Sequence, residues 1–345
     1  MPRALPDVLR IVWPTATAAP PAATDAALER AAGILVAGGL VAIPTETVYG
    51  LAANALDDQA VAAIYRAKGR PAGNPLIVHV ADTEMARTLA ADWPAAAAAL
   101  AARFWPGPLT LVVPRGGRIP SIVTGGGETV ALRCPDHPLA RRLIAKAGVP
   151  LAAPSANRSE AVSPTTAQHV LAGLGNRIDL ILDGGPCARG IESTVVDCTT
   201  SPPRVLRPGP LVAGELVGVV PGITATGQSE AGPVRSPGQA ARHYAPRTPL
   251  ELTDDPCGRV TQLLAGGGRV GWLALDTEDP RVRELAASRD LIIVPMPADP
   301  QAYAARLYAT LHALDQRPLD RIVVDAPPDL EAWLAIRDRL VRAGG

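Results

Sequence analysis

The sequence contains few cysteine and aromatic residues, and each shortage excludes a class of protein. Its four cysteines lie far apart, without a C-x-x-C pair, at Cys134, Cys187, Cys198 and Cys257. This spacing excludes the common zinc-binding and redox motifs and is typical of reduced thiols in a cytoplasmic protein. Aromatic residues make up 3% of the chain, which argues against a protein whose main task is to stack RNA bases.

Net charge and long apolar runs are also missing. The 33 basic and 33 acidic residues give a formal net charge of zero, so no overall field attracts nucleic acid or a membrane surface. The apolar run at 95–102 is mostly alanine and ends before Arg103, so it predicts a helix rather than a membrane span. Pro14, Pro20 and Pro21 interrupt the N-terminus, which excludes a signal-peptide core. We expect a cytoplasmic protein without membrane contact.

The sequence lacks the short motifs of the commonest nucleotide-binding and hydrolytic enzymes. A Walker A loop, H-E-x-x-H and G-x-S-x-G are absent, and the triple glycine at 266–268 precedes a predicted strand, unlike a dinucleotide fingerprint. Lysine is also rare, since Lys68 and Lys146 are the only two among 33 basic residues. A compact ammonium group, where arginine is otherwise the rule, favours a phosphate-facing role for Lys68.

Length and pattern predict two α/β domains. The 345 residues, 48% of them hydrophobic, are enough for two cores. Strands alternate with helices, but several strands follow each other directly, so the first sheet is predicted to be mixed. We expect a flexible lead-in at 1–23, a twisted mixed-sheet domain at 24–210, a Pro/Gly/Ser-rich linker at 211–247 and a smaller doubly wound parallel domain at 248–345.

The expected elements follow from apolar periodicity and from turn residues. In the first domain, strands are predicted near 40–43, 76–80, 109–113, 129–133, 150–153, 178–183, 193–197 and 204–207, and helices from Thr24 to Gly38, from Asp57 to Lys68, and near 83–91, 95–104, 137–147 and 165–173. In the second, strands are predicted near 249–253, 269–275, 290–295 and 321–325, and helices near 256–265, 280–287, 300–314 and 328–342.

Residues 43–80 contain the densest group of polar candidates. A short apolar strand leads into a polar turn, a helix follows, and a second strand closes the stretch. The candidates combine hydroxyl, carboxylate, amide and cationic groups: Thr45, Glu46, Thr47, Tyr49, Lys68, Arg70, Asn74 and His79. Such groups bind a phosphorylated, charged substrate more naturally than they build a core.

Further polar turns lie at predicted strand ends, at 154–159, 163–165 and 190–194, and Arg133 and Arg207 each close a strand. In an α/β sheet, such turns gather along one edge, where ligands bind.

Each of these residues also has a structural alternative. Ser155 and Ser163 would serve as turn and N-cap residues, and Arg133 and Arg207 as ion-pairing groups. His79 would be a core histidine, and Tyr244 would fasten the linker.

Six ordered segments carry a family resemblance. They read PTETVYGLAANA, KGRPAGNPL, PSANRSEAVSPT, GIESTVVD, LRPGP and SPGQAARHYAP, and they fall within residues 24–247. In this order they resemble the threonylcarbamoyl-AMP synthase family, whose catalytic module is the YrdC-like domain. The tail resembles the extra C-terminal domain of the longer members. The resemblance implies a twisted α/β sheet with a concave, positively lined cavity, followed by a smaller Rossmann-like domain.

The resemblance also implies an ATP-dependent enzyme of tRNA modification. Such an enzyme joins L-threonine, bicarbonate (or CO2) and ATP into L-threonylcarbamoyladenylate and releases pyrophosphate, with Mg2+ accompanying ATP. Threonylcarbamoyl transferase machinery then moves the group onto the adenosine beside the anticodon of tRNAs that read codons starting with A. The family domain also binds double-stranded RNA, so a direct RNA contact stays open.

Site residues are carried over by the same resemblance. The threonine site is expected to comprise Thr47, His79, Arg133, Ser193 and the backbone at Ala153. The nucleotide contacts are expected at Lys68, Arg70, Asn74, Thr129, Ser155, Ser163 and Arg207, with Tyr244 closing over the nucleotide. Lys68 and Arg70 are the predicted catalytic residues, because cations stabilise charge on the reacting phosphates. Glu46 is expected to help to bind Mg2+ or to orient its turn.

Two other functions are considered. A nucleic-acid binding module without catalysis would grip RNA by shape, but the zero net charge and few aromatic residues argue against it. A carbamoyl-transfer enzyme that uses carbamoyl phosphate shares the YrdC-like domain. It would also carry acylphosphatase-like and zinc-finger segments, and the cysteine spacing excludes the latter.

Overall fold

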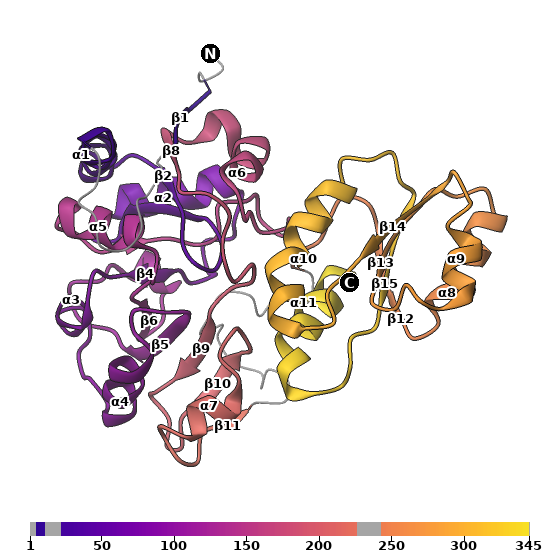
Figure 1. Ribbon diagram of the computed structural model, residues 1–345. Coiled ribbons are helices and arrows are strands. Elements are labelled where there is room, and N and C mark those ends of the chain that lie inside the picture. Colours follow the sequence, from indigo (N-terminus) through magenta and orange to yellow (C-terminus); the bar gives the residue numbers. More distant parts are fainter. Residues whose placement is uncertain (1–4, 11–21, 226–242, 345) are drawn as a thin grey trace. The chain divides into compact units, whose positions relative to one another are not determined.

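The computed structural model describes residues 5–10, 22–225 and 243–344, and the chain divides into two units (Figure 1). The first unit comprises Met1–Ser159, Ser163–Ala188 and Glu192–Gln239. The second comprises Glu160–Val162, Arg189–Ile191 and Ala240–Gly345. Among the described helices, none is long and apolar enough to cross a membrane.

The first unit is built on an eleven-stranded mixed sheet in the order β1-β8-β2-β3-β7-β4-β6-β5-β9-β10-β11. Its strands are β1 (Asp7–Arg10), β2 (Val41–Ile43), β3 (Gly50–Asn54), β4 (Ile77–His79), β5 (Leu109–Pro114), β6 (Thr129–Arg133), β7 (Leu151–Ala152), β8 (Leu180–Asp183), β9 (Thr194–Asp197), β10 (Arg204–Arg207) and β11 (Thr224–Ala225). Parallel pairs such as β4–β6 stand beside antiparallel pairs such as β2–β3. The predicted mixed sheet is confirmed.

Helices cover both faces of this sheet. They are α1 (Ala22–Val36), α2 (Asp58–Lys68), α3 (Thr83–Arg87), α4 (Ala95–Phe104), α5 (Pro138–Ala147), α6 (Ala167–Leu174) and α7 (Ala213–Val217), with 3-10 turns η1 (Ser121–Thr124) and η2 (Gly175–Arg177). Alternate residues around β2 enter different cores, since Ala42 packs in one apolar cluster and Val41 and Ile43 pack in another, with Leu28 of α1. Burial on both faces explains the continuous apolar runs of the strands.

Helix α2 has a defined beginning and end. The Asp57 side chain accepts hydrogen bonds from the backbone N–H groups of Gln59 and Ala60. Gly69 follows the helix with φ +65°, a left-handed conformation that glycine adopts at little cost. The helix predicted from Asp57 to Lys68 is thus confirmed, and these two residues make Lys68 the last helical residue.

Three segments differ from the sequence-based expectation. Residues 7–10 were expected in a flexible lead-in, but they form β1, which pairs with β8. Strand β3 was not predicted, because its sequence GLAAN lacks β-branched residues and pairing with β2 and β7 decides its conformation. Helix α7 and strand β11 lie within the expected linker, and β11 pairs with β10. Residues 226–242 of that linker lie outside the described residues.

The second unit is an open parallel sheet in the order β12-β15-β13-β14. Its elements are β12 (Leu250–Thr253), α8 (Pro256–Ala265), β13 (Val270–Ala274), α9 (Pro280–Leu285), β14 (Leu291–Pro295), α10 (Pro300–Leu314), β15 (Arg321–Asp325), η3 (Glu331–Trp333) and α11 (Leu334–Gly344). Figure 1 shows α10 and α11 on one face of this sheet and α8 and α9 on the other. The predicted doubly wound parallel domain is confirmed.

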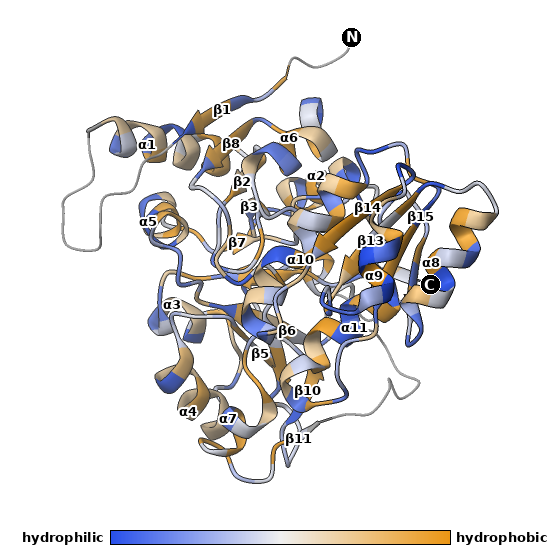
Figure 2. Cartoon of the chain, turned by 45° about the vertical axis from the view of Figure 1, so that its right-hand side comes forward, coloured by the Kyte–Doolittle hydropathy of each residue, from blue (hydrophilic) through white to orange (hydrophobic). Residues whose placement is uncertain are grey.

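Three helices of the second unit share one initiation signal. An aspartate caps α8, α9 and α10, and a proline follows each cap as the first helical residue, at Pro256, Pro280 and Pro300. Proline suits this position, because the first N–H of a helix has no intrahelical partner. Strand β13 is buried along its whole length, whereas β14, at the edge of the sheet, is partly exposed although its sequence is apolar; Figure 2 shows β14 in the colours of hydrophobic residues.

The cap of α2 gives a testable prediction. In Asp57→Ala the amides of Gln59 and Ala60 lose their acceptor, and such changes cost about 0.5–2 kcal/mol. We expect the opening free energy of these amides, measured by native-state hydrogen exchange, to fall by about 1 kcal/mol. Asp57→Asn, which keeps an accepting oxygen, and Asp58→Ala, one residue further on, are the controls. Equal protection in all variants would contradict the capping role.

Candidate active site

Backbone hydrogen bonds join three of the predicted polar turns. The Tyr49 N–H donates to the Pro164 carbonyl at 2.8 Å, and the Ala156 N–H donates to the Tyr49 carbonyl at 2.8 Å. The turns at 44–49, 154–157 and 163–165 therefore form one connected assembly. Strands β2 and β6 run in opposite directions, because three antiparallel pairings lie between them. The expectation that all the turns lie at the carboxyl edge of one sheet is therefore wrong. Hydrogen bonds between the turns connect them instead.

Lys68 is the centre of this assembly. Its side chain is buried, and Nζ donates to the carbonyl oxygens of Ser155 at 2.5 Å and Asn157 at 2.6 Å and to Asn157 Oδ1 at 3.4 Å. These partners are neutral, so the ammonium has no carboxylate beside it among the described residues. Burial, and then the charge of Arg70, hold the pKa of Lys68 well below its ordinary value.

Arg70 and Asn74 lie just beyond the end of α2. The Arg70 guanidinium donates from Nε to the Asn74 carbonyl at 3.3 Å and from Nη2 to the Pro75 carbonyl at 3.0 Å. Asn74 Oδ1 is buried and has no hydrogen-bond partner among the described residues. These groups thus share with Lys68 the region between α2 and β4.

A second group surrounds Arg133 at the end of β6. Nη2 of Arg133 donates to Glu46 Oε1 at 2.7 Å, and both side chains are largely buried, at 4% and 11% exposed. His79 of β4 pairs in register with Arg133, and the N–H of Ala153 donates to the neighbouring Ile77 carbonyl at 2.9 Å. Thr47 is fully buried, and its Oγ1 lies 2.9 Å from Thr45 Oγ1.

Two polar atoms in this second group have no hydrogen-bond partner among residues 5–10, 22–225 and 243–344. They are Glu46 Oε2 and His79 Nδ1, and both are buried. A buried polar atom without a partner costs about 1–3 kcal/mol, so native proteins rarely leave one without a reason. A polar ligand that reached these atoms would recover that energy.

A third group joins β9 and β10. Arg207 donates from Nε to the Ser193 carbonyl at 3.1 Å and from Nη2 to Ser193 Oγ at 3.1 Å, and Ser193 Oγ lies 2.7 Å from Thr110 Oγ1. Arg133 Nε also donates to the Gly107 carbonyl at 3.4 Å. Gly107 lies shortly before Thr110 in the chain, so this hydrogen bond connects the second group with the third.

The remaining predicted residues are spread over neighbouring elements. Ser163 is fully buried, and its hydroxyl donates to Glu192 Oε1 at 2.6 Å. Thr129, half-buried, begins β6. Tyr244 belongs to the second unit, where it is 1% exposed, stacks on Tyr308 at 5.8 Å and lies under the Arg339 guanidinium at 5.2 Å. Its backbone is left-handed, with φ +61°.

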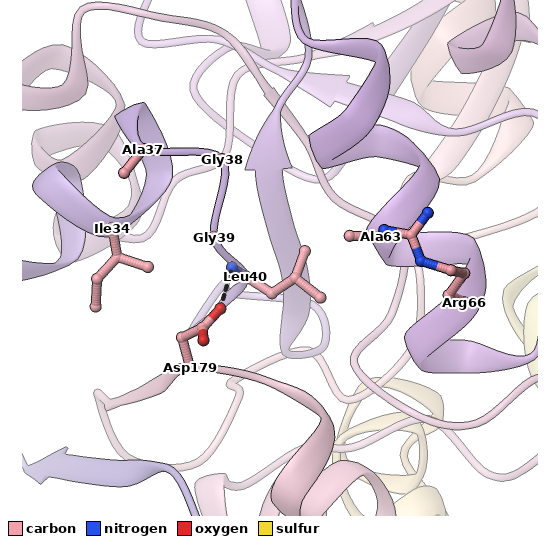
Figure 3. A pocket seen from close by; sticks show the side chains of 8 residues that line it. All are labelled: Ile34, Ala37, Gly38, Gly39, Leu40, Ala63, Arg66 and Asp179. Atoms are coloured by element: carbon pink, nitrogen blue, oxygen red, sulfur yellow. Dashed lines mark hydrogen bonds between the residues drawn. The ribbon is translucent and has the colours of Figure 1, made fainter. Parts of the chain in front are cut away.

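A separate depression of about 640 Å³ lies at the amino ends of β2 and β8. Figure 3 shows Asp179, bonded to the Leu40 N–H, on one side of it and Arg66 of α2 on the other. None of the predicted site residues lines it.

Comparison with known proteins gives the chain's family. A family model described as "Telomere recombination" (Sua5_yciO_yrdC) matches residues 33–209, and a model described as "Threonylcarbamoyl-AMP synthase, C-terminal domain" matches residues 212–345. The chain is 43% identical to a threonylcarbamoyl-AMP synthase of Bacillus subtilis (strain 168), over 93% of this chain and 94% of the relative. The chain belongs to the threonylcarbamoyl-AMP synthase family.

Other members of this family agree over the same length. A threonylcarbamoyl-AMP synthase of Pyrococcus abyssi (strain GE5 / Orsay) is 40% identical, over 91% of this chain and 93% of the relative. The crystal structure of P. abyssi Sua5 complexed with L-threonine superposes with a TM-score of 0.87 at 37% identity, covering 98% of both chains. The family predicted from six sequence motifs is confirmed, and so is its two-part fold.

Sequence reasoning missed the partner of Arg133. Glu46 was considered as a helper for Mg2+ or as a turn residue, but its carboxylate pairs with Arg133, 87 positions away in the sequence. Long-range pairing of this kind leaves no periodic signal. Among the described residues, no group of three or more His, Cys, Asp or Glu side chains is arranged to hold a metal ion.

Burial of His79 predicts an acid-sensitive fold. Burial first, and then the charge of Arg133, lower the pKa of His79 from 6.5 to about 3. The unfolded chain gains a proton below pH 6.5 while the folded chain does not, so stability falls as the pH falls towards 3. The contribution of His79 to the free energy of unfolding then falls by up to about 1.4 kcal/mol for each pH unit.

We expect His79→Gln to lose less stability than the wild type on acidification. Between about pH 6.5 and 4.5, the difference should reach about 2 kcal/mol in urea-unfolding titrations. His137→Gln is a second test of the same kind, because burial also lowers the pKa of that imidazole, and it should change the pH dependence in the same direction. Parallel pH curves for wild type and His79→Gln would contradict a neutral buried imidazole.

Proposed function

We propose that the protein joins L-threonine, bicarbonate (or CO2) and ATP into L-threonylcarbamoyladenylate and releases pyrophosphate. Family membership over nearly the whole chain supports this activity. The single observation that carries it in the structure is Lys68, a buried ammonium bonded only to neutral oxygens. A phosphate group would supply the negative charge that this site lacks.

The proposed nucleotide site is centred on Lys68. Arg70, Asn74, Thr129, Ser155, Ser163 and Arg207 are proposed to contact ATP, and Tyr244 is proposed to close over it. Lys68, Arg70 and Arg207 are at most 8% exposed, so their charges act at low dielectric, where an anion gains most. Lys68 and Arg70 are proposed to stabilise the charge that develops on the phosphates.

The proposed threonine site surrounds Arg133. Its guanidinium would bind the carboxylate, and Thr47, His79, Ser193 and the backbone at Ala153 would contact the rest of the molecule. His79 stays neutral under this proposal, because its lowered pKa keeps the proton off above about pH 3. A neutral imidazole can either donate to the threonine hydroxyl or accept from it. P. abyssi Sua5, whose structure includes L-threonine, is similar to this chain at a TM-score of 0.87.

The proposed chemistry has two steps. The threonine ammonium first gives a proton to bicarbonate, which yields CO2 and water; the neutral amine then adds to CO2, releases a second proton to solvent and gives N-carboxythreonine. A carbamate oxygen then attacks the α-phosphate in line, expelling pyrophosphate. No covalent enzyme intermediate is needed, so catalysis rests on positioning and charge stabilisation. Excluding water protects the labile carbamate and its adenylate.

Mg2+ is proposed to enter with ATP. It would neutralise phosphate charge, and phosphate oxygens and water are the hard ligands that it prefers. The carboxylates of Glu46 and Glu192 accept hydrogen bonds from Arg133 and Ser163, so we assign neither as a metal ligand.

The proposed partners follow from the product. Threonylcarbamoyl transferase machinery would consume the labile adenylate and modify the adenosine beside the anticodon of tRNAs that read codons starting with A. We propose a cytoplasmic location, in keeping with four free, buried cysteines. A direct RNA contact of the basic residues is a further proposal.

The activity is tested by pyrophosphate release. Purified protein with ATP and Mg2+ should release pyrophosphate only when both L-threonine and bicarbonate are present. Serine in place of threonine is the control for the amino acid, and EDTA should abolish release. Release that ignores threonine, from protein that still binds double-stranded RNA, would instead support a binding module.

The role of Lys68 is tested by substitution. Lys68→Ala should reduce the turnover number by about 100-fold or more, because a charge-stabilising donor in a dry site contributes about 3–4 kcal/mol. Lys146→Ala, the only other lysine change possible, is a matched control, since Lys146 pairs with Asp25 and Glu29 on an exposed face. Near wild-type turnover in Lys68→Ala would refute the assignment.

A further inference from the structure

Glu46 is a buried carboxylate to which the proposed function gives no role. It lies in the turn after β2 and is 9% exposed. Thr45 fixes this turn, because its Oγ1 accepts from the N–H groups of Thr47 and Val48, each at 3.2 Å, and donates to the Val48 carbonyl at 2.6 Å. The backbone that carries Glu46 is therefore held in place without any ligand.

The two oxygens of Glu46 differ. Oε1 accepts from Arg133 Nη2 at 2.7 Å, whereas Oε2 is buried and has no hydrogen-bond partner among the residues that the structure describes. A buried carboxylate oxygen without a donor is rare in native proteins. We therefore look for the missing donor in a ligand.

Three groups around Glu46 are uncharged near neutral pH. His137, Cys134 and Cys187 lie within electrostatic reach of its carboxylate. Burial lowers the pKa of the His137 imidazole and raises the pKa of both thiols. Arg133 is thus the cation that balances Glu46 in this set, and it occupies only one of the two oxygens.

The arrangement matches a zwitterionic amino acid. Arg133 offers a guanidinium, Glu46 a carboxylate oxygen, and His79, which pairs in register with Arg133, a ring nitrogen without a partner. L-Threonine carries a carboxylate, an ammonium and a hydroxyl on adjacent carbons. Opposite charges held side by side complement a zwitterion, and each buried atom would gain a partner.

We propose that Glu46 Oε2 accepts a hydrogen bond from the ammonium of threonine, while Oε1 keeps Arg133 oriented towards the carboxylate. Glu46 is then a specificity-determining and positioning residue, which selects α-amino acids and holds the nitrogen that later reacts with CO2. This inference rests on the proposed function.

The test compares two ligands that differ only in the amino group. We would measure the dissociation constants of L-threonine and 3-hydroxybutanoate by calorimetry, for full-length wild type and for Glu46→Gln. The variant should bind threonine about 10- to 100-fold more weakly, the range for hydrogen bonds between charged groups. It should bind 3-hydroxybutanoate as well as the wild type or better, because Arg133 no longer has a competing anion.

Steady-state kinetics provide a second readout. The KM for threonine should rise in Glu46→Gln while the KM for ATP stays within about twofold, and Glu46→Asp should recover part of the loss. Glu128→Gln is the matched control, because Glu128 also faces an arginine, Arg115, at 3.6 Å but is 89% exposed.

Other outcomes would overturn the inference. If Glu46→Gln weakens the binding of both ligands equally, Glu46 only orients Arg133. If the variant binds both ligands more tightly, Glu46 only competes with the ligand carboxylate for Arg133. Pyrophosphate release by the wild type establishes the proposed function separately, so such a result counts against Glu46 alone. If the wild type binds no threonine, the proposed function is contradicted, and so is the proposed hydrogen bond between Glu46 and the threonine ammonium.

Discussion

The burial of positive charge is the constraint on which the first unit depends. Lys68, Arg70, Arg133 and Arg207 are all at most 8% exposed, although a buried cation is costly unless oxygen atoms surround it. Much of the irregular backbone supplies such oxygens. The 155–157 turn points carbonyls at Lys68, the residues after α2 do so for Arg70, and Ser193 does so for Arg207. Each of these irregular segments thus packs its carbonyl groups around a buried cation.

Helix α2 shows how the regular structure meets this constraint. Its length is set at one end by the Asp57 cap and at the other by the left-handed Gly69, so Lys68 is the last helical residue. A helix one residue longer or shorter would turn the ammonium away from the carbonyls by about 100°. The Ser159 N–H also donates to the Lys68 carbonyl at 2.9 Å, so backbone and side chain of one residue both hold the same turn.

Local signals explain which features could be predicted from the sequence. The bounds of α2 and most of the apolar strands depend on neighbouring residues, and the structure confirms them. Strand β3 and the pair between Glu46 and Arg133 depend on partners far along the chain, so propensity and periodicity do not reveal them. The site residues came from matched motifs, and the structure adds their contacts. It also corrects the idea of a common sheet edge, because strand direction in a mixed sheet does not follow from the sequence pattern.

The two proposed subsites differ in how they treat charge. Around Arg133 the charge is already balanced by Glu46, and threonine, a zwitterion, would enter without altering the sum. Around Lys68 the partners are neutral and the pKa is lowered, so a phosphate would bring the missing counter-charge and favour the protonated amine. Under this proposal, threonine recognition would depend on matching directions of hydrogen bonds, whereas nucleotide binding would depend on net attraction. The two proposed subsites would thus distinguish a small zwitterion without net charge from a nucleotide polyanion, because neither subsite satisfies the other's ligand.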